Sequence, residues 1–195
     1  MPERNIQPPN HDNFWVESLK TVGLSLFLAF GIRTAVAQSY FIPSSSMEPT
    51  LKIDDRLMVD KLSYHFANPQ RGDIVVFNPP EAVIKEQNLH DPFIKRVIGL
   101  PGEQVEVKGG RVYINNLPLR ENYIADKPNY AWGPQLVPPN SYLVLGDNRN
   151  NSYDGHYWGF VRRDHIIGRA VVRFWPLDRI SGLGEQATRL DSTRQ

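Results

Sequence analysis

The sequence predicts a mostly β fold of antiparallel strands, which follows one apolar helix near the N-terminus. Three observations carry this prediction. Short apolar runs bounded by turn residues recur along the chain, two alternating segments flank a Gly-Gly turn, and no long amphipathic helical pattern separates them. The chain has 195 residues, 41% of them hydrophobic, which suits one globular domain with its own core and a short appendage.

The first expected element is an apolar helix. Its uncharged part, residues 21–32, is shorter than the roughly 20 residues that a membrane span needs. Counting onward to residue 42 restores the length, provided that Arg33 extends its guanidinium to the lipid headgroups. We therefore expect residues 14–42 to form a transmembrane anchor, with Trp15 and Tyr40 near opposite interfaces.

A cleavable signal peptide is the alternative interpretation of this segment. A small-x-small sequence, Ala35-Val36-Ala37, follows the apolar run where such peptides are cut. Acidic residues in the long leading region, Glu3, Asp12 and Glu17, argue against a signal peptide. A serine-rich candidate site also follows the cut closely, so we favour an uncleaved anchor.

The body of the domain, residues 43–182, contains the remaining expected strands. Each is a short apolar run bounded by turn residues, as buried strands are. These runs are residues 56–60, 73–77, 141–145 and 168–174, of which the last is expected to be the final strand. The polar ends of the chain, residues 1–13 and 183–195, are expected to be mobile tails.

The clearest local structure is a tight hairpin. Residues 105–108 and 111–114 alternate between apolar and polar side chains on either side of Gly109-Gly110, a pattern that predicts two antiparallel strands joined by a two-residue turn. The Pro- and Asn-rich stretch at residues 118–140 is either a small subdomain or a long excursion between strands.

Composition excludes several classes of function. The net charge of +1 and the scattered arginines give no basic face for nucleic acid. The chain has no cysteine, which excludes disulfides, thiolate metal sites and cysteine nucleophiles. Its five histidines show no HExxH spacing, so we expect no metal and no cofactor.

Two short stretches offer a nucleophile and a base for hydrolysis. Residues 43–51, PSSSMEPTL, place hydroxyls in a turn-like segment, and residues 93–102, FIKRVIGLPG, set one lysine in an apolar run. A serine needs a base, and a lysine is a base only if burial lowers its pKa from about 10.4, by up to ~3 to 5 units when burial is full. The pattern indicates a Ser/Lys peptidase. The alternative is that the serines are ordinary turn hydroxyls and that the lysine is a surface charge.

The chain resembles the type I signal peptidases over residues 14–182. Besides the two stretches above, residues 71–77, RGDIVVF, match a third family motif, and residues 146–154, GDNRNNSYD, followed by Tyr157-Trp158-Gly159, match the last. Four motifs in order are more specific than any one of them. The resemblance implies the large antiparallel β fold of these peptidases and an N-terminal transmembrane helix.

The resemblance also implies a function and a location. Type I signal peptidases are membrane-bound serine endopeptidases that remove signal peptides from exported preproteins, after Ala-x-Ala sites. The resemblance implies that the partners are secretory preproteins and a lipid bilayer. The expected location is the plasma (inner) membrane, or the thylakoid membrane, crossed once, with the N-terminus in the cytoplasm and the catalytic domain on the exported side.

Residue roles are carried over by matching positions in the motifs. Ser46 matches the nucleophile, which forms the acyl-enzyme. Lys95 matches the general base, which takes the proton of the serine and later gives it to the leaving amine. Ser44 matches the hydroxyl that joins the backbone N–H of Ser46 in stabilising the oxyanion. Ser152 matches the hydroxyl that orients the lysine amine. For each serine the alternative is a turn hydroxyl bonded to nearby backbone.

The remaining expected site residues support the dyad or line the substrate pocket. Arg96 and Asp147 match a structural ion pair, and Asp154 is expected to brace the site. Shallow apolar pockets for small substrate side chains are expected to be lined by Ile42, Pro43, Met47, Leu51 and Ile94. Core packing is the alternative for these residues, and for Leu51 the two interpretations are equally weighted.

The sequence departs from the family pattern at Ser45, Asn150 and Gly155-His156. His156 suggests a pH-sensitive contact with Asp154, which is a hypothesis. A Ser/His/Asp triad built on Asp154 and His156 rests on proximity in sequence alone. A calcium loop beginning at Asn150 has Val161 where a glutamate is required.

Three other functions remain as alternatives. Two are peptidases on the same scaffold, namely a narrow-specificity enzyme such as a pilin-maturation peptidase and a self-cleaving repressor. The third is an exported, non-catalytic β-domain, whose apolar segment would be a cleaved signal peptide. Four aromatic residues are expected either to rest on lipid or to pack in the core: Tyr40, Phe41, Trp158 and Trp175.

Overall fold

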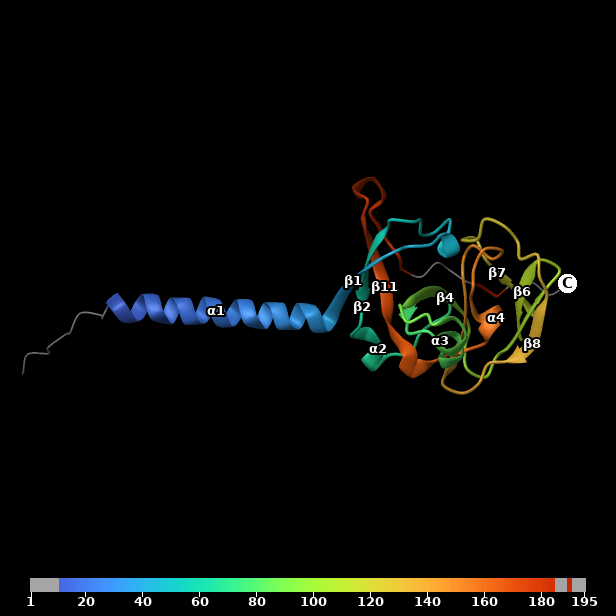
Figure 1. Cartoon of the computed structure of the whole chain (residues 1–195), viewed down its shortest axis with the longest axis horizontal. Coiled ribbons are helices and arrows are strands. Elements are labelled where there is room, and N and C mark those ends of the chain that lie inside the picture. Colours follow the sequence, from blue (N-terminus) through green and yellow to red (C-terminus); the bar gives the residue numbers. More distant parts are fainter. Residues whose placement is uncertain (1–10, 185–188, 191–195) are drawn as a thin grey trace, which may run out of the picture. The chain divides into compact units, whose positions relative to one another are not determined.

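A computed structural model describes residues 11–184 and 189–190 of the chain. The chain divides into two compact units, residues 1–36 and residues 37–195. The first unit contains helix α1, His11–Val36, and the second contains the strands (Figure 1). The mostly β, antiparallel fold predicted from the sequence is confirmed for the second unit.

Helix α1 exposes large apolar side chains over its described part. Phe14, Trp15, Leu19, Leu24 and Phe27 are each at least 60% exposed. Judged on the residues that the structure describes, no helix combines the length and the apolar character that a bilayer crossing requires.

The apolar segment is shorter as a helix than the sequence suggested. Helix α1 ends at Val36, and strand β1, Ala37–Phe41, pairs antiparallel with β2, Arg56–Asp60. The expectation of one continuous membrane segment at residues 14–42 is therefore wrong at its C-terminal end. The backbone groups of this end are paired by a neighbouring strand, and Tyr40 packs against a core cluster.

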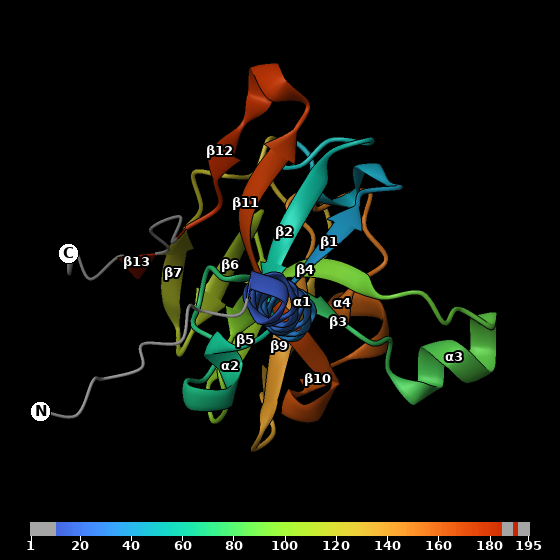
Figure 2. The ribbon, with the colours of Figure 1, turned by 90° about the vertical axis from the view of Figure 1, so that its left-hand side faces the viewer.

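In the part of the chain that the structure describes, the larger sheet contains eight strands and carries the central part of the domain. Its strand order is β1-β2-β11-β3-β4-β9-β10, and β12 also pairs with β11. Figure 2 shows β1, β2 and β11 side by side at one end of this order. The strands not yet bounded are β3 Ile74–Phe77, β4 Phe93–Gly99, β9 Ser141–Leu145, β10 Val161–Arg162, β11 Ile166–Trp175 and β12 Ser181–Gly182.

The smaller sheet contains, among the described residues, five strands in the order β13-β7-β6-β5-β8. Its strands are β5 Gln104–Lys108, β6 Arg111–Ile114, β7 Leu117–Arg120, β8 Trp132–Leu136 and β13 Arg189–Leu190. The predicted hairpin is confirmed, because Lys108 pairs with Arg111 across a turn in which Gly109 and Gly110 have φ of 54° and 73°. Both angles lie in the left-handed region that this two-residue turn needs.

Two predicted segments differ from the structure. Residues 118–140 include the end of β7 and all of β8, so part of the stretch belongs to the smaller sheet. Residues 183–195 are not simply a tail, because Leu183 is buried and β13 pairs with β7. The tail at residues 1–13 overlaps the start of α1, and its first ten residues lie outside the described part.

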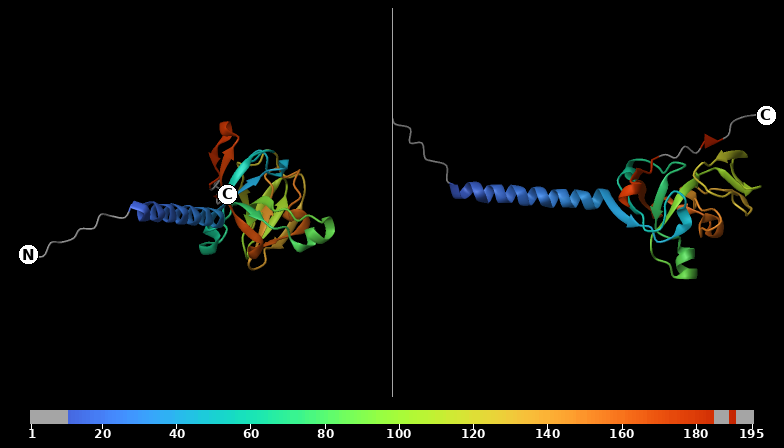
Figure 3. Two further views of the ribbon diagram at one scale, coloured as in Figure 1. Left: turned by 60° about the vertical axis from the view of Figure 1, so that its left-hand side comes forward. Right: turned by 90° about the horizontal axis from the view of Figure 1, so that it is seen from above.

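The other elements are short helices on the connections between strands. The α-helices are α2 Ser63–Phe66, α3 Glu81–Gln87 and α4 Gly155–Trp158, and the 3-10 helices are η1 Ser45–Met47, η2 Arg163–His165 and η3 Leu177–Arg179. Figure 3 shows α3 extending away from the sheets of its unit in both views. These helices are short, so the second unit remains mostly β.

Over the described residues the core consists of three apolar clusters, and β3 lies between two of them. Ile74 and Val76 pack in one cluster with Leu57, whereas Val75 and Phe77 pack in another with Val144. This burial on both faces explains the unbroken apolar run of β3. The third cluster joins the smaller sheet to β4 and β9 of the larger one.

The four aromatic residues that the sequence left between core and lipid divide evenly. Tyr40 and Trp158 pack against core clusters. Phe41 and Trp175 are 54% and 45% exposed. Core packing therefore accounts for the first two only.

Candidate active site

The turn that carries the candidate nucleophile follows strand β1. Ser44 has an extended backbone, with φ −137° and ψ 159°, and η1 begins at the next residue. Met47 is fully buried and anchors this short helix in the core, and the backbone N–H of Glu48 donates to the Ser45 carbonyl. The turn thereby presents Ser46 with its hydroxyl toward β4, while the residue itself is only 7% exposed.

Lys95 lies opposite Ser46, on strand β4. Its Nζ is 2.8 Å from Ser46 Oγ and 3.0 Å from the carbonyl oxygen of Ile94. The Phe93 ring forms a further part of its surroundings, with its centroid 5.8 Å from Nζ. These distances place the two groups within the reach needed for proton transfer.

Burial is the main reason why this lysine can lose its proton. Lys95 is 6% exposed, and desolvation lowers the pKa of its ammonium from the usual 10.5 to about 8. The negative charges of Asp154 and Asp147 act in the opposite direction, but burial is the larger effect. Near pH 8 and above, a substantial fraction of Lys95 is therefore a neutral amine.

The loop at residues 146–154 holds the nucleophile turn from the other side. The backbone N–H of Asn148 donates to the Ser46 carbonyl at 3.1 Å, and its side-chain amide donates to the Ser45 carbonyl at 3.1 Å. The Asn151 amide donates to Ser45 Oγ at 3.0 Å. A methyl group at Gly146 would overlap both Ser152 Oγ and the Ser46 carbonyl, so the loop approaches the turn as closely as only glycine permits.

The two other expected serines lie in the same place but differ in their contacts. Ser44 Oγ is 3.3 Å from Ser46 Oγ, beside the dyad. Ser152 is 7% exposed, and its Oγ has no hydrogen-bond partner among the described residues. The structure therefore brings Ser152 to the site without the bond to Lys95 that the family pattern implies.

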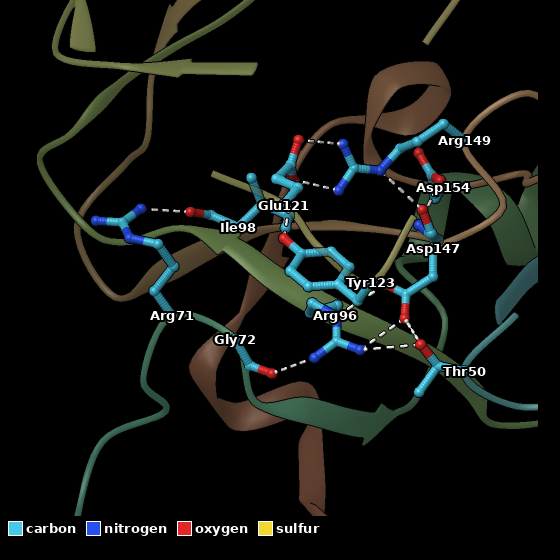
Figure 4. Close-up of polar contacts among 11 residues, drawn as sticks. Thr50, Arg71, Gly72, Arg96, Ile98, Glu121, Tyr123, Asp147, Arg149 and Asp154 are labelled. Atoms are coloured by element: carbon cyan, nitrogen blue, oxygen red, sulfur yellow. Dashed lines mark hydrogen bonds and ion pairs between the residues drawn. The ribbon is translucent and has the colours of Figure 1, made fainter. Parts of the chain in front are cut away.

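Arg96, the residue after Lys95, points into a buried ion pair. Its Nε and Nη2 donate to the two carboxylate oxygens of Asp147, at 2.8 and 2.6 Å, and both side chains are fully buried (Figure 4). Nη1 donates to the Gly72 carbonyl, and Thr50 Oγ1 donates to Asp147. The structure thus joins the pair that was expected as a structural support.

A second buried pair extends this network toward the smaller sheet. Arg149 is paired with Glu121 (Figure 4). Its Nε donates to the Gly146 carbonyl at 3.0 Å. The ring of Tyr123 lies against the Arg96 guanidinium, with 4.0 Å between the ring centroid and Cζ. The network connects the segment after β7 to the loop that supports Ser46.

Asp154 holds the same loop from within. Its Oδ2 accepts the backbone N–H of Gly146 at 2.7 Å, and its Oδ1 lies 2.7 Å from Nδ1 of His156. The His156 ring stacks on Tyr130, with centroids 4.1 Å apart. Asp154 therefore braces the loop, and the suspected contact with His156 is present.

A surface hollow of about 390 Å³ opens over the dyad. Its lining is Pro43, Ser44, Ser45, Ser46, Gln87, Leu89, Asp91, Pro92, Phe93, Ile94, Lys95, Asn151 and Tyr153. Of the five residues expected to line a substrate pocket, the structure places Pro43 and Ile94 here. Ile42, Met47 and Leu51 pack instead in a core cluster and are at most 2% exposed, so the expectation for these three is corrected to core packing.

Sequence reasoning missed several residues of the site. Asn148 and Asn151 lie inside one of the four motifs, and their side-chain amides could have been recognised there as hydrogen-bond donors. No sequence pattern indicated Glu121, because its partner, Arg149, is distant in the sequence. Gln87 and Leu89 lie outside the motifs, and only the path of the chain after α3 brings them to the hollow.

Comparison with known proteins supplies the family. The family model "Signal peptidase, peptidase S26" matches residues 15–175. "Signal peptidase I" of Leptolyngbya laminosa is 62% identical, over 90% of this chain and 87% of the relative. "Probable signal peptidase I-2" of Synechocystis sp. is 58% identical, over 96% of this chain and 84% of the relative.

A plant relative belongs to the same group. "Thylakoidal processing peptidase 1, chloroplastic" of Arabidopsis thaliana is 37% identical, over 85% of this chain and 50% of that protein. The family match covers the nucleophile turn, β4 and the supporting loop. The chain belongs to the signal peptidase family, peptidase S26.

Proposed function

We propose that this protein is a type I signal peptidase that removes signal peptides from exported preproteins, with Ser46 as nucleophile and Lys95 as general base. The observation that carries the assignment of the dyad is the 2.8 Å separation of Lys95 Nζ and Ser46 Oγ in a buried setting. A serine endopeptidase activity follows from the family, whose mechanism is a Ser/Lys dyad.

The acylation step uses the neutral form of Lys95. Its amine accepts the proton of the Ser46 hydroxyl while Oγ attacks the carbonyl carbon of the scissile peptide bond. The resulting ammonium then gives that proton to the leaving amine as the C–N bond breaks. The signal peptide is left as an ester on Ser46, and the mature protein leaves with its new amino terminus.

The oxyanion that forms during this attack needs donors already in place. The backbone N–H of Ser46 and the hydroxyl of Ser44, which lies 3.3 Å from Ser46 Oγ, are the proposed donors. The hydrogen bonds from Asn148 to the carbonyls of Ser45 and Ser46 support this assignment, because they hold the turn that aims these groups.

Deacylation repeats the proton transfers with water. Lys95, neutral again, takes a proton from a water molecule that attacks the ester, and the proton passes to Ser46 Oγ as the acid product leaves. We assign Ser152 to orienting the amine in these steps. Its unpartnered, buried hydroxyl is available for that contact.

Selectivity for small side chains before the scissile bond fits the walls of the hollow. Pro43 and Ile94 line it, and the residues behind them are packed in the core, so the walls have little room to move. Steric exclusion of large side chains discriminates more strongly than apolar attraction, since one methylene is worth only about 1–3 kcal/mol. We therefore propose cleavage after Ala-x-Ala sites.

The direct test is cleavage of a preprotein by detergent-purified enzyme. The substrate carries Ala-x-Ala before its mature start, and the amino terminus of the product is sequenced. Cleavage after the second alanine by wild type, and none by Ser46→Ala or Lys95→Met of equal thermal stability, is the expected result. A folded wild type that leaves this substrate intact would argue for a narrow-specificity relative or a non-catalytic domain.

We also assign the N-terminal segment to membrane attachment, with the N-terminus in the cytoplasm and the β-domain on the exported side. The uncharged run at residues 21–32 and the exposed apolar side chains of α1 support attachment. We propose the plasma membrane or the thylakoid membrane as the location, and a relative named for thylakoidal processing supports the second. Carbonate extraction followed by protease protection of each terminus tests both parts; release by carbonate would exclude a spanning anchor.

A further inference from the structure

The connection between β3 and β4 is longer than these strands require. Phe77 pairs with Phe93, so a two-residue turn would be sufficient to join them. The chain instead uses residues 78–92, which contain α3. Figures 2 and 3 show α3 projecting from the β-domain beyond this pair of strands. A connection of this length on one side of the active site calls for a function.

The segment is built so that its end returns to the active site. Val83 of α3 is fully buried, so one side of this helix is packed. Asn88 ends the helix in the left-handed region, with φ 53°, and its N–H donates to the Ile84 carbonyl at 2.9 Å. The chain turns there, and Leu89 lines the same hollow as Ser46 and Lys95.

Leu89 is placed where a substrate would pass. Strand β3 occupies one edge of residues 93–95, and β9 pairs with β4 only from Arg96 onward. Among the described strands, none pairs with the other edge of residues 93–95, so an extended peptide can add there. A peptide that continues along this edge, away from Lys95, reaches Leu89 several residues from the scissile bond.

The chemistry of the side chain decides which part of the substrate it meets. Leu89 is 39% exposed, and single exposed leucines are common on protein surfaces. This one, however, forms a wall of the active-site hollow beside Pro92 and Phe93. Signal peptides carry an apolar region just before the small residues of the cleavage site. An apolar wall beyond the dyad matches that region.

We propose that Leu89 is a specificity-determining residue, which contacts the end of the substrate's apolar region several residues before the scissile bond. This inference rests on the proposed function and adds a distal subsite to it. The contact is made by a side chain outside the four motifs. Its contribution is gained on binding the substrate and does not involve the proton transfers of the dyad.

Two peptides that share one Ala-x-Ala site test the proposal. In the first, the fourth to seventh residues before the bond are leucines, and in the second they are serines. The enzymes are wild type, Leu89→Ala, Leu89→Met and, as a matched control, Leu62→Ala, which alters a leucine that is 42% exposed and does not line the hollow. Thermal unfolding of all four checks that they are folded.

The expected result is a selective loss. Leu89→Ala lowers kcat/KM on the leucine peptide about fivefold, mainly through KM, and leaves the serine peptide unchanged, because only the first peptide loses an apolar contact. Leu89→Met restores the wild-type value, since methionine keeps the apolar volume. Leu62→Ala behaves as wild type on both peptides.

Equal losses on both peptides, or no loss on either, would overturn the distal subsite. The proposed function is judged separately, by whether wild type cuts the serine peptide at the expected bond. A wild type that cuts both peptides while Leu89→Ala shows no selectivity leaves the peptidase assignment standing and removes only the role of Leu89.

Discussion

Lys95 and Arg96 are adjacent cations on one strand, and their surroundings lead to opposite outcomes. Both side chains are buried, at 6% and 0% exposure. Arg96 is bonded through two nitrogens to Asp147, whereas the contacts of Lys95 Nζ are a hydroxyl, a carbonyl and an aromatic ring. Burial without a bonded carboxylate therefore lowers the pKa of Lys95, whereas the buried guanidinium of Arg96 has its charge balanced by Asp147.

The strand explains how such different surroundings meet in adjacent residues. Successive side chains of a strand point to opposite faces, so Lys95 faces the nucleophile turn while Arg96 faces the network of Asp147 and Tyr123. One face of β4 supplies a base, and the other fixes the loop that supports the nucleophile. The comparison predicts that changes on the two faces have different consequences.

The largest effect is expected from removing the base. Lys95→Arg keeps a cation but cannot accept a proton, and Lys95→Met has no nitrogen at all, so both should lower kcat/KM by roughly 10³-fold or more. The measurement is preprotein cleavage under single-turnover conditions. Lys108→Met, at a side chain 54% exposed, is the control and should retain activity. Substantial activity in Lys95→Arg would break the contrast between the two cations.

The next effect concerns the opposite face of β4. Asp147→Asn leaves the buried guanidinium of Arg96 without its countercharge, which should cost about 3–5 kcal/mol of the free energy of unfolding. Urea unfolding measures it. Asp164→Asn removes a carboxylate of an exposed pair with Arg162, so it should change stability little. Equal changes in the two variants would show that burial of the ion pair is unimportant.

A third effect is the pH dependence of stability. Burial lowers the pKa of Lys95 to about 8 in the folded state, compared with 10.5 ordinarily. The unfolded chain therefore binds more protons between these values, so this residue makes stability rise with pH across that window, by about 3 kcal/mol. Urea unfolding at several pH values should show this rise in wild type and lack it in Lys95→Met. A parallel rise in both would assign it to other groups.

The smallest effect concerns the carboxylates that raise the pKa of Lys95 against the lowering by burial. Below pH about 8, cleavage should slow as Lys95 becomes protonated, by tenfold per pH unit. Asp154 raises the pKa of Lys95, and residue 156 lies next to Asp154. A permanent cation in His156→Arg offsets Asp154, so its activity should begin at lower pH than that of His156→Gln, by a few tenths of a unit. Identical pH profiles would exclude this coupling.

Local sequence patterns were sufficient for the parts of the fold that depend on local physics. The hairpin around Gly109-Gly110 and the strand at residues 56–60 follow from alternation and turn chemistry, and the structure has both. The end of α1 did not follow. Residues 37–41 carry no charge and were counted with the helix, but their pairing with β2 makes them a strand. Composition alone does not report such a partner.

The candidate site divides in the same way. Ser46 and Lys95 were identified through motifs, and the structure brings them together. The same turn contains Met47, which was expected in the pocket but packs in the core, because the face that a side chain takes in a 3-10 turn depends on the surrounding fold. Glu121 was not identified, since its pairing with Arg149 depends on the meeting of two distant segments.

The hydrogen bonds between the nucleophile turn and its supporting loop have a consequence for synthesis of the chain. The bond from the Asn148 amide to the Ser45 carbonyl joins residues 103 positions apart. A nascent chain that has not yet reached Asn148 already contains Ser46 and Lys95 but lacks the groups that hold Ser46 in place. The chain therefore becomes an active peptidase only late in translation. Until then it is unable to cut its own alanine site at residues 35–37, which lies only a few residues before Ser46 in the sequence.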